Sequence, residues 1–403
     1  MKTLAERITV LHYVHEWLPQ TEIWLYDQVT QLPEWVDNHV FCEATSNLDQ
    51  FAVRNLHCFS EASALRRYWD KGLRRLRIRN YPGYLMAHAR QINPHIVHSH
   101  FGNVGWSNRR AAQRLGAGHL VTFYGLDVNL LPMIDPRWRA RYRELFLSVD
   151  RVLCEGPHMA RCIVGLGCQE EKVRVHHLGV RVEEIPYRPR SWQPGTPLRV
   201  LIAATFREKK GIPYALAALG AIRREVPVQL TVIGDATAEP RSQAEKARIL
   251  AALDEFGLKP HTRLLGFCAY EEFMKEAYDH HIFLSPSVTA SDGDTEGGAP
   301  VGIIQMAASG MPIVSTRHCD IPNVLPASAE LAEERDVAGL VHRLRWLVEN
   351  AGNWEPELAP ARRHVELNFN AHIQGLRLAE IYADVAGVPT RRVTESTVMT
   401  TPS

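Results

Sequence analysis

Short runs of β-branched and apolar residues alternate with longer amphipathic stretches along almost the whole chain. This alternation predicts strands separated by helices, which form parallel sheets with helices on both faces. At 403 residues the chain is too long for one ordinary core, so two α/β domains are expected. Strands are predicted at 8–14, 95–100, 120–124, 151–155, 173–177, 198–205, 229–233, 263–266, 282–285 and 312–315.

A proline-rich polar segment interrupts this pattern near the midpoint and predicts a linker. We therefore expect an N-terminal domain at 1–185, a linker at 186–197 and a C-terminal domain at 198–370. A helical pattern follows at 371–387. The last stretch, 388–403, is rich in Thr, Ser and Pro, which predicts a disordered tail.

Composition excludes several classes of protein. The 46 basic and 45 acidic residues give a net charge of +1, which argues against nucleic acid as a partner. Seven scattered cysteines without a Cys-x-x-Cys pair indicate neither a disulfide framework nor a zinc site. With no apolar run long enough to span a bilayer, a cytoplasmic protein is expected.

The most informative segment, 285–322, reads SPSVTASDGDTEGGAPVGIIQMAASGMPIVSTRHCDIP. A strand ends at Ser285, a polar glycine-rich loop follows, and a helix is predicted with Pro300 in its first turn. Unpaired amides at a helix N-terminus bind anions, and Gly297 and Gly298 permit close approach, so phosphate is the expected ligand. A tight turn without a ligand is the alternative. Glu296 suits sugar or ribose hydroxyls better than phosphate.

A second cluster, AATFREKKG at 203–211, follows the first strand of the C-terminal domain. Arg207, Lys209 and Lys210 stand at a strand-to-helix junction, where open α/β sheets bind ligands. Arginine and lysine both suit phosphate oxygens. A solvated basic turn is the alternative, but two anion-binding clusters on one sheet edge together favour a diphosphate.

Two polar groups follow strands of the N-terminal domain. In PHIVHSHFG, His98 and His100 point to one face, and we expect His98 to pack inside and His100 to contact a ligand. No carboxylate lies at ligand spacing, so no metal site is predicted. In VTFYGLDVN, Asp127 either contacts the ligand or caps the following turn.

A basic segment with interleaved aromatics runs from Arg66 to Tyr84 and reads RRYWDKGLRRLRIRNYPGY. Seven basic residues and one acid lie between Arg66 and Arg79, a composition that suits an anionic membrane surface. A solvated or salt-bridged helix face is the alternative.

These stretches together resemble the retaining glycosyltransferases of family 4, in the branch of the colanic acid and amylovoran exopolysaccharide enzymes. DGDTEGGAPVGIIQMAASGMPIVSTRHCDIP carries most of the likeness, with TFREKKGIPYALAAL, LTVIGD, HSHFG, TFYGLD and VRVHHLGV in support. The resemblance implies the GT-B fold, in which two Rossmann-like domains face each other across a cleft and a C-terminal helix returns to the N-terminal domain.

The resemblance also implies a role for each matching residue. His100, Glu296 and Asp127 would be catalytic, Glu296 and Gly297 would hold the sugar, and Gln305 would hold the nucleoside. The donor diphosphate would be bound by Arg207, Lys210, Gly298, Ala299 and Pro300. Gln305 replaces the second glutamate of the family's signature, and Tyr124 stands where the family often has histidine.

The expected activity is therefore metal-independent transfer, with retention, from a nucleotide-diphosphate sugar to a glycan or lipid-linked acceptor in polysaccharide synthesis. No cofactor is expected beyond that co-substrate. The protein would be peripheral at the inner face of the membrane, held through Arg66–Arg79. An inactive sugar-nucleotide-binding partner protein and a GT-B-fold epimerase are the alternatives.

Overall fold

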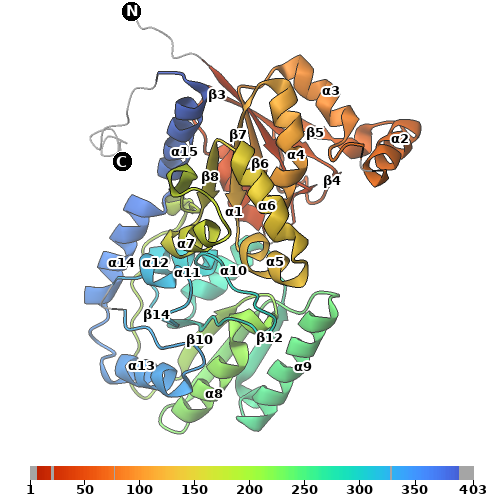
Figure 1. The fold of residues 1–403 in the computed structure, drawn as a ribbon. Helices are drawn as coiled ribbons and strands as arrows, with labels where there is room; N and C mark the ends of the chain where they lie inside the picture. The colour runs from red at the N-terminus through yellow and green to blue at the C-terminus, as the bar shows by residue number, and fades with distance from the viewer. Residues whose placement is uncertain (1–6, 20–21, 77, 327–328, 390–403) are drawn as a thin grey trace, which may run out of the picture. The chain divides into compact units, whose positions relative to one another are not determined.

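The computed structural model describes residues 7–19, 22–76, 78–326 and 329–389. The chain divides into two compact units, which we call unit 1 (Met1–Arg181 with Phe369–Ser403) and unit 2 (Val182–Asn368). Each unit is built on a parallel sheet flanked by helices (Figure 1).

Unit 1 contains a seven-stranded parallel sheet in the order β5-β3-β1-β6-β7-β8-β9. The chain proceeds from β1 to one edge and from β6 to the other, so the strand order reverses between these two neighbours. Ligands of open α/β sheets bind at such a switch point. The strands are β1 (Ile8–Tyr13), β3 (Val36–Cys42), β5 (Leu56–Cys58), β6 (Ile96–His100), β7 (Gly118–Phe123), β8 (Arg151–Cys154) and β9 (Val173–Val175), with a short ribbon of β2 (Glu16–Trp17) and β4 (Ala44–Thr45).

Within the described residues no helix combines the length and apolar character needed to cross a membrane. Helices flank the sheet of unit 1. They are α1 (Ile23–Thr30), α2 (Ala64–Arg75), α3 (Gly83–Ile92), α4 (Gly102–Leu115), α5 (Leu131–Ile134), α6 (Arg137–Ser148), α7 (Pro157–Gly165) and α15 (Ala371–Ala386), with a π-helical turn at Leu126–Leu130.

Unit 2 contains a five-stranded parallel sheet in the order β12-β11-β10-β13-β14. Its strands are β10 (Leu198–Ala203), β11 (Val228–Ile233), β12 (Thr262–Gly266), β13 (Ile282–Ser285) and β14 (Ile313–Ser315). Its helices are α8 (Ile212–Ile222), α9 (Pro240–Glu255), α10 (Tyr270–Tyr278), α11 (Val301–Ser309), α12 (Ile321–Val324), α13 (Val337–Glu349) and α14 (Glu355–Asn368).

Every predicted strand is present, with small differences at the ends, and the prediction of two parallel α/β units is confirmed. The sequence analysis missed β3 and β5. Strand β3 continues from Val36 with Asp37, Asn38 and His39, so its apolar pattern emerges only in its second half.

The proline-rich segment expected as a linker at 186–197 falls in unit 2. The amides of Arg188 and Arg190 donate to the carbonyls of Ser309 and Gly310 at the end of α11, at 3.0 and 2.9 Å, and Trp192 is buried. The expected tail at 388–403 lies, apart from its first two residues, outside the described part of the chain.

The C-terminal helix α15 belongs to unit 1, as predicted (Figure 1, dark blue). Its Leu378 and Tyr382 are fully buried in one apolar cluster with Ile8 of β1 and Ile96 of β6. Its Gly375 lies so close to the end of α1 that an added Cβ would come within 2.1 Å of the Gln31 carbonyl oxygen.

Two glycine-to-alanine variants in helices of unit 1 test this packing. Gly375→Ala should lower the free energy of unfolding by about 1–3 kcal/mol, because the backbones of α1 and α15 must separate. Gly72→Ala in α2 meets no atom within 4 Å and should be neutral or stabilising. Urea unfolding measures both. Equal stability of the two variants would contradict the placement of α15 against α1.

Candidate active site

Two loops meet at the carboxyl edge of the sheet of unit 2. One follows β10 and carries Lys209 and Lys210, and the other follows β13. The Val288 amide donates to the Lys209 carbonyl at 2.8 Å. Gly211 has a φ of +63°, and a Cβ there would overlap the Pro286 carbonyl oxygen, so only glycine allows this approach. The predicted basic cluster and glycine-rich loop therefore come together.

An ion pair joins the two loops. Lys210 Nζ lies 2.8 Å from Glu296 Oε2, and Ser287 Oγ donates to Glu296 Oε1 at 2.8 Å. Burial would raise the pKa of Glu296, but the positive charges of Lys210 and Lys209 and these hydrogen bonds outweigh it and lower the pKa to about 2. Glu296 is therefore a carboxylate at neutral pH.

Arg207, the other predicted diphosphate ligand, makes different contacts. Its guanidinium donates to Glu239 at 2.7 Å and to Asp294 at 3.4 Å, and Lys209 also binds Asp294, at 3.1 Å. Arg207 lines a cavity of about 160 Å³ together with Arg241. Arg207 and Lys210 thus lie in one loop cluster but in separate ion pairs.

Backbone amides just before helix α11 have no hydrogen-bond acceptor among the described residues. Helix α11 begins at Val301 with Pro300 as its N-cap, one residue earlier than the predicted place of the proline in the first turn. The backbone of Gly297 is in the left-handed region, with a φ of +79°. The amides of Gly298 and Ala299 have no acceptor among the described residues. Unpaired amides at a helix N-terminus form an anion site, as the sequence predicts.

Gln305 lies on the same helix, α11, and is buried. Its side-chain amide forms no hydrogen bond with any described residue. A side-chain amide without a protein partner is available to a polar ligand such as a ribose hydroxyl. Its predicted contact with the nucleoside stays a prediction.

The sequence analysis missed the residues that hold the Glu296 loop. The Glu296 amide donates to His318 Nε2 at 3.2 Å, and His318 Nδ1 donates to Glu334 at 2.6 Å. Glu334 in turn accepts the Thr289 amide at 2.7 Å. His318 lies in the segment TRHCDIP, whose one histidine after a buried strand was the available signal.

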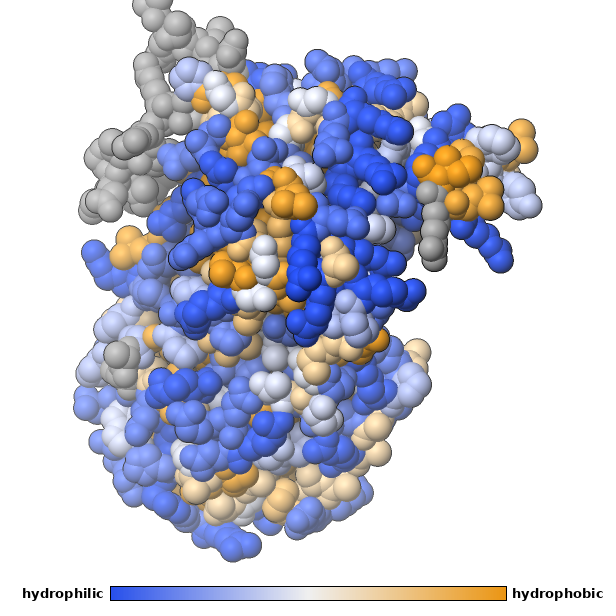
Figure 2. All heavy atoms as spheres, viewed as in Figure 1, coloured by the Kyte–Doolittle hydropathy of each residue, from blue (hydrophilic) through white to orange (hydrophobic). Residues whose placement is uncertain are grey.

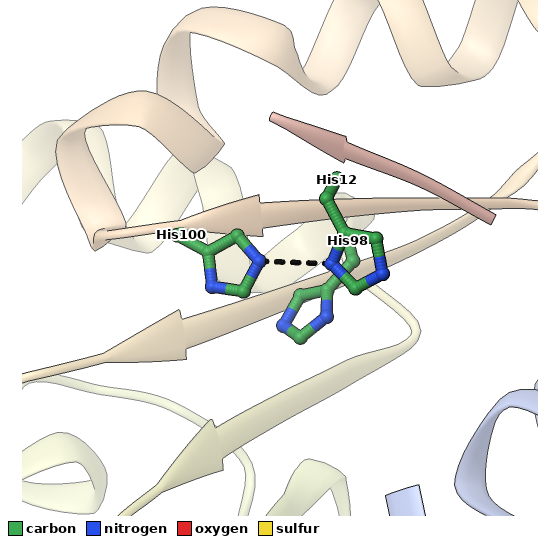
Figure 3. A group of neighbouring side chains, drawn as sticks. All are labelled: His12, His98 and His100. Carbon is green, nitrogen blue, oxygen red and sulfur yellow. Dashed lines mark hydrogen bonds between the residues drawn. The ribbon is translucent and has the colours of Figure 1, made fainter. Parts of the chain in front are cut away.

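In unit 1, His100 ends β6 beside the switch point and is fully buried. Its Nδ1 lies 2.6 Å from the Tyr124 hydroxyl and its Nε2 lies 3.0 Å from Nδ1 of His12 on β1 (Figure 3). Both ring nitrogens therefore face protein groups. The role of His100 at the donor sugar stays a prediction, and His12 was missed by the sequence analysis.

His98 packs inside with a satisfied ring, as predicted. Its Nδ1 lies 2.7 Å from the Tyr382 hydroxyl, and its Nε2 lies 2.7 Å from Thr122 Oγ1. The possible ligand atoms of His12, His98 and His100 lie within 4.8 Å of one another, a spacing that suits a metal ion. All six ring nitrogens, however, already lie within hydrogen-bonding distance of polar atoms of the protein.

Asp127 has the geometry of a turn cap. Its carboxylate accepts the amides of Gly102 at 2.6 Å and Tyr124 at 2.9 Å, and it is fully buried. Burial raises the pKa of Asp127 to about 6, although these backbone hydrogen bonds oppose the shift. These contacts tie the start of α4 to the turn after β7 and match a capping role, and the predicted catalytic role of Asp127 stays a prediction.

Comparison with known proteins identifies both halves of the chain. Residues 21–184 match the family model of glycosyltransferase family 4, and residues 197–350 match that of the group 1 glycosyl transferases. AmsK of Erwinia amylovora, an amylovoran biosynthesis glycosyltransferase, is 30% identical over 310 residues, which cover 76% of this chain and 74% of AmsK.

Solved structures with low sequence identity share the fold. HepE of Anabaena, in complex with UDP and glucose, superposes with a TM-score of 0.73 at 14% identity, over 94% of this chain and 100% of that one. Sucrose-phosphate synthase of Thermosynechococcus elongatus gives a TM-score of 0.74 at 16% identity, with the same coverage. The two Rossmann-like units are thus those of the GT-B fold, and the chain belongs to glycosyltransferase family 4.

Proposed function

We propose that this glycosyltransferase moves a sugar from a nucleotide-diphosphate donor to a glycan or lipid-linked acceptor, with retention of configuration, in exopolysaccharide synthesis. The Lys210–Glu296 ion pair beside the unpaired amides of Gly298 and Ala299 is the observation that carries the proposal. It combines a cation and a helix terminus for phosphate with a carboxylate for sugar hydroxyls.

The relatives support the choice of substrates. AmsK acts in the synthesis of amylovoran, and the HepE structure contains UDP and glucose. A donor bound at the same sheet edge would bring its phosphates to α11 and its ribose to Gln305, whose carbonyl oxygen can accept one hydroxyl. Gly297 would allow the sugar to approach the backbone beside Glu296.

The chemistry requires stabilisation of a diphosphate that gains negative charge as it leaves. Lys210 and the amides at the start of α11 would supply this stabilisation without reorganising. The sugar would pass through an oxocarbenium-like state, and retention would follow from attack by the acceptor on the face that the diphosphate leaves. Because these groups provide the positive charge, we propose that transfer needs no metal ion at the diphosphate.

The surface of helix α2 supports a membrane-bound acceptor. Leu65, Tyr68, Trp69 and Leu76 repeat at helical spacing and are exposed, Leu65 and Tyr68 to 80%. Figure 2 shows hydrophobic atoms gathered over this helix beside hydrophilic ones. An exposed apolar helix face with basic neighbours suits the interface of an anionic membrane.

The opposite face of α2 is firmly held. The fully buried Asp70 accepts the Tyr84 amide at 2.9 Å and pairs with Arg66 and Arg79. Lys71 and Arg75 remain exposed, and neither forms an ion pair with a described residue. These two cations are therefore available to lipid phosphates.

The donor site is tested by Lys210→Ala. A thermal-shift screen of UDP-, GDP-, ADP- and dTDP-sugars first identifies the donor, since ligands stabilise the state that they bind. Transfer of that donor should then slow by a factor on the order of 10²–10³, because one preorganised cation is lost. Lys259→Ala, which removes an exposed Lys–Asp pair in unit 2, is the matched control. Full activity of Lys210→Ala would refute the assignment.

Metal independence is tested by assaying the wild type after dialysis against EDTA and with EDTA present. The proposal predicts an unchanged transfer rate, because Lys210 and the amides of α11 carry out the electrostatic role. Activity that disappears in EDTA and returns with added Mg²⁺ would show that a metal ion assists the leaving diphosphate.

The membrane surface is tested by sedimentation with vesicles of phosphatidylglycerol and phosphatidylcholine. Leu65→Ser with Trp69→Ser should weaken binding about tenfold or more, from the loss of apolar burial. Lys71→Gln with Arg75→Gln should weaken it mainly at low salt, by about 1 kcal/mol per charge. Leu147→Ser on α6, an equally exposed leucine elsewhere in unit 1, is the control. Wild-type protein that stays in the supernatant at low salt would contradict the proposal.

A further inference from the structure

A chain of hydrogen bonds crosses the core of unit 1. It contains seven links and joins, in order, the Val29 carbonyl, Asn38, His12, His100, Tyr124, Gln28, His176 and the Gln374 carbonyl. The successive distances are 3.2, 3.3, 3.0, 2.6, 3.0, 3.3 and 3.0 Å. The chain connects strands β1, β3 and β6 with helices α1 and α15.

This chain of hydrogen bonds has one hydrogen fewer than its seven links require. Each end is a backbone carbonyl, which only accepts. Each of the six groups between them, when neutral, donates one hydrogen along the chain and accepts one, since an amide donates through nitrogen and accepts through oxygen. Six hydrogens cannot fill seven links. Turning an amide over moves the gap but does not remove it.

Working inward from the two ends locates the gap. Asn38 donates to the Val29 carbonyl, so its oxygen must accept a hydrogen from Nε2 of His12. The nitrogen that remains, Nδ1 of His12, then carries only a lone pair.

The other end leads to the same link. His176 donates to the Gln374 carbonyl and accepts from Gln28, whose oxygen accepts the Tyr124 hydroxyl hydrogen. The Tyr124 oxygen therefore accepts Nδ1–H of His100. Nε2 of His100 and Nδ1 of His12 are left as two lone pairs, 3.0 Å apart (Figure 3).

A cation between these two nitrogens would complete the chain. We propose that the His12–His100 link is a proton-binding site, in which one proton from solvent is shared between Nδ1 of His12 and Nε2 of His100. Seven hydrogens then fill seven links. The inference rests on the core of unit 1 and does not depend on the donor, the acceptor or the role of His100.

The surroundings favour a proton over a metal ion. Both nitrogens of His98, the third imidazole, are already bonded to hydroxyls at 2.7 Å. Nitrogen ligands about 2.0–2.1 Å from a tetrahedral zinc ion would lie farther apart than the 3.0 Å observed here. The titratable groups beside the pair are His98, His39, Tyr124 and Tyr382, while His176 acts on His98, and the carboxylates of Asp127 and Glu155 act on Tyr124.

Burial opposes the uptake of a proton, and His119 provides an internal reference for that effect. Burial lowers the pKa of His119 to about 4, lowers that of His12 to the same value, and also lowers the pKa of His100. Nε2 of His119 is hydrogen-bonded to Ser99, and its Nδ1 has no partner. A proton added to His119 therefore completes no hydrogen bond within the protein. The His12–His100 pair should therefore take up a proton at a higher pH than His119.

Imidazole ¹⁵N–¹H spectra of the labelled full chain test the proposal from about pH 8 to about pH 5. At the higher pH, His12 should carry its hydrogen on Nε2 and His100 on Nδ1. On acidification the pair should become protonated about one pH unit or more above His119. The same tautomer in both rings at high pH, or uptake no earlier than in His119, would overturn the proposal.

Two variants supply the missing hydrogen between His12 and His100, one by changing a partner of His100 and the other by changing a partner of His12. Tyr124→Phe lets His100 carry its hydrogen on Nε2 and donate to His12, and Asn38→Leu lets His12 donate to His100. In either variant, early proton uptake should disappear. Tyr142→Phe is the control, because that buried hydroxyl donates to the Asp127 carbonyl at 2.8 Å, off the chain. Early uptake that persists in both folded variants would contradict the proposal.

The occupant is tested separately by elemental analysis and by adding zinc to EDTA-treated protein. The proposal predicts less than one zinc per chain and unchanged ¹⁵N shifts of His12 and His100. One equivalent of zinc that shifts both rings would replace the proton by a metal ion and overturn the assignment.

Discussion

The ion pair between Lys210 and Glu296 organises the carboxyl edge of unit 2. A carboxylate as buried as Glu296 requires a cation beside it, and the removal of one partner from such a pair typically costs about 3–5 kcal/mol. The pair therefore fixes the loop after β10 against the loop after β13. Ser287 and His318 hold the second loop from the other side, and the same loop leads into the unpaired amides of α11. The proposed site for a diphosphate sugar is thus held in place by contacts within unit 2 itself.

Around His12 and His100, unit 1 buries polar groups without such an ion pair. Its core contains a network of imidazoles, amides and hydroxyls, and the buried carboxylate of Asp127, after β7, is satisfied by backbone amides. In a medium of low polarity such neutral groups can be buried only if each finds a partner. The count of hydrogens between His12 and His100 follows from this requirement. The network around His12 and His100 in unit 1 is thus made of uncharged groups, whereas the two loops of unit 2 meet through an ion pair.

Much of this arrangement could be predicted from the sequence because it depends on local pattern. Alternation of apolar residues located the strands, and the periodicity at 371–386 gave helix α15. The Gly297–Gly298 loop and the Lys210 cluster were located by their position after strands. Parallel strands bring such loops to one edge, so their meeting could also be expected.

The rest depends on side-chain partners that no local pattern contains. Arg207 stands beside Lys210 in sequence, yet Glu239 and Asp294 direct it to another ion pair. His12 lies in an ordinary apolar strand, and only the pairing of β1 with β6 reveals its contact with His100. His318 lies in the same segment as the Gly297–Gly298 loop, but its partner Glu334 lies outside that segment, so their hydrogen bond could not be predicted from the local pattern. Asp127 is predicted as ligand or cap, and its two amide partners, Gly102 and Tyr124, could not be found from the sequence.

The central claim is that Lys210 and the start of α11 bind the second phosphate of a nucleotide. Isothermal titration of the wild type and Lys210→Ala with the diphosphate and the monophosphate of the same nucleoside tests it most directly. The account predicts that the wild type prefers the diphosphate by about tenfold or more, the equivalent of about 1.4 kcal/mol, and that the variant loses most of this preference. An equal preference in both proteins would contradict it.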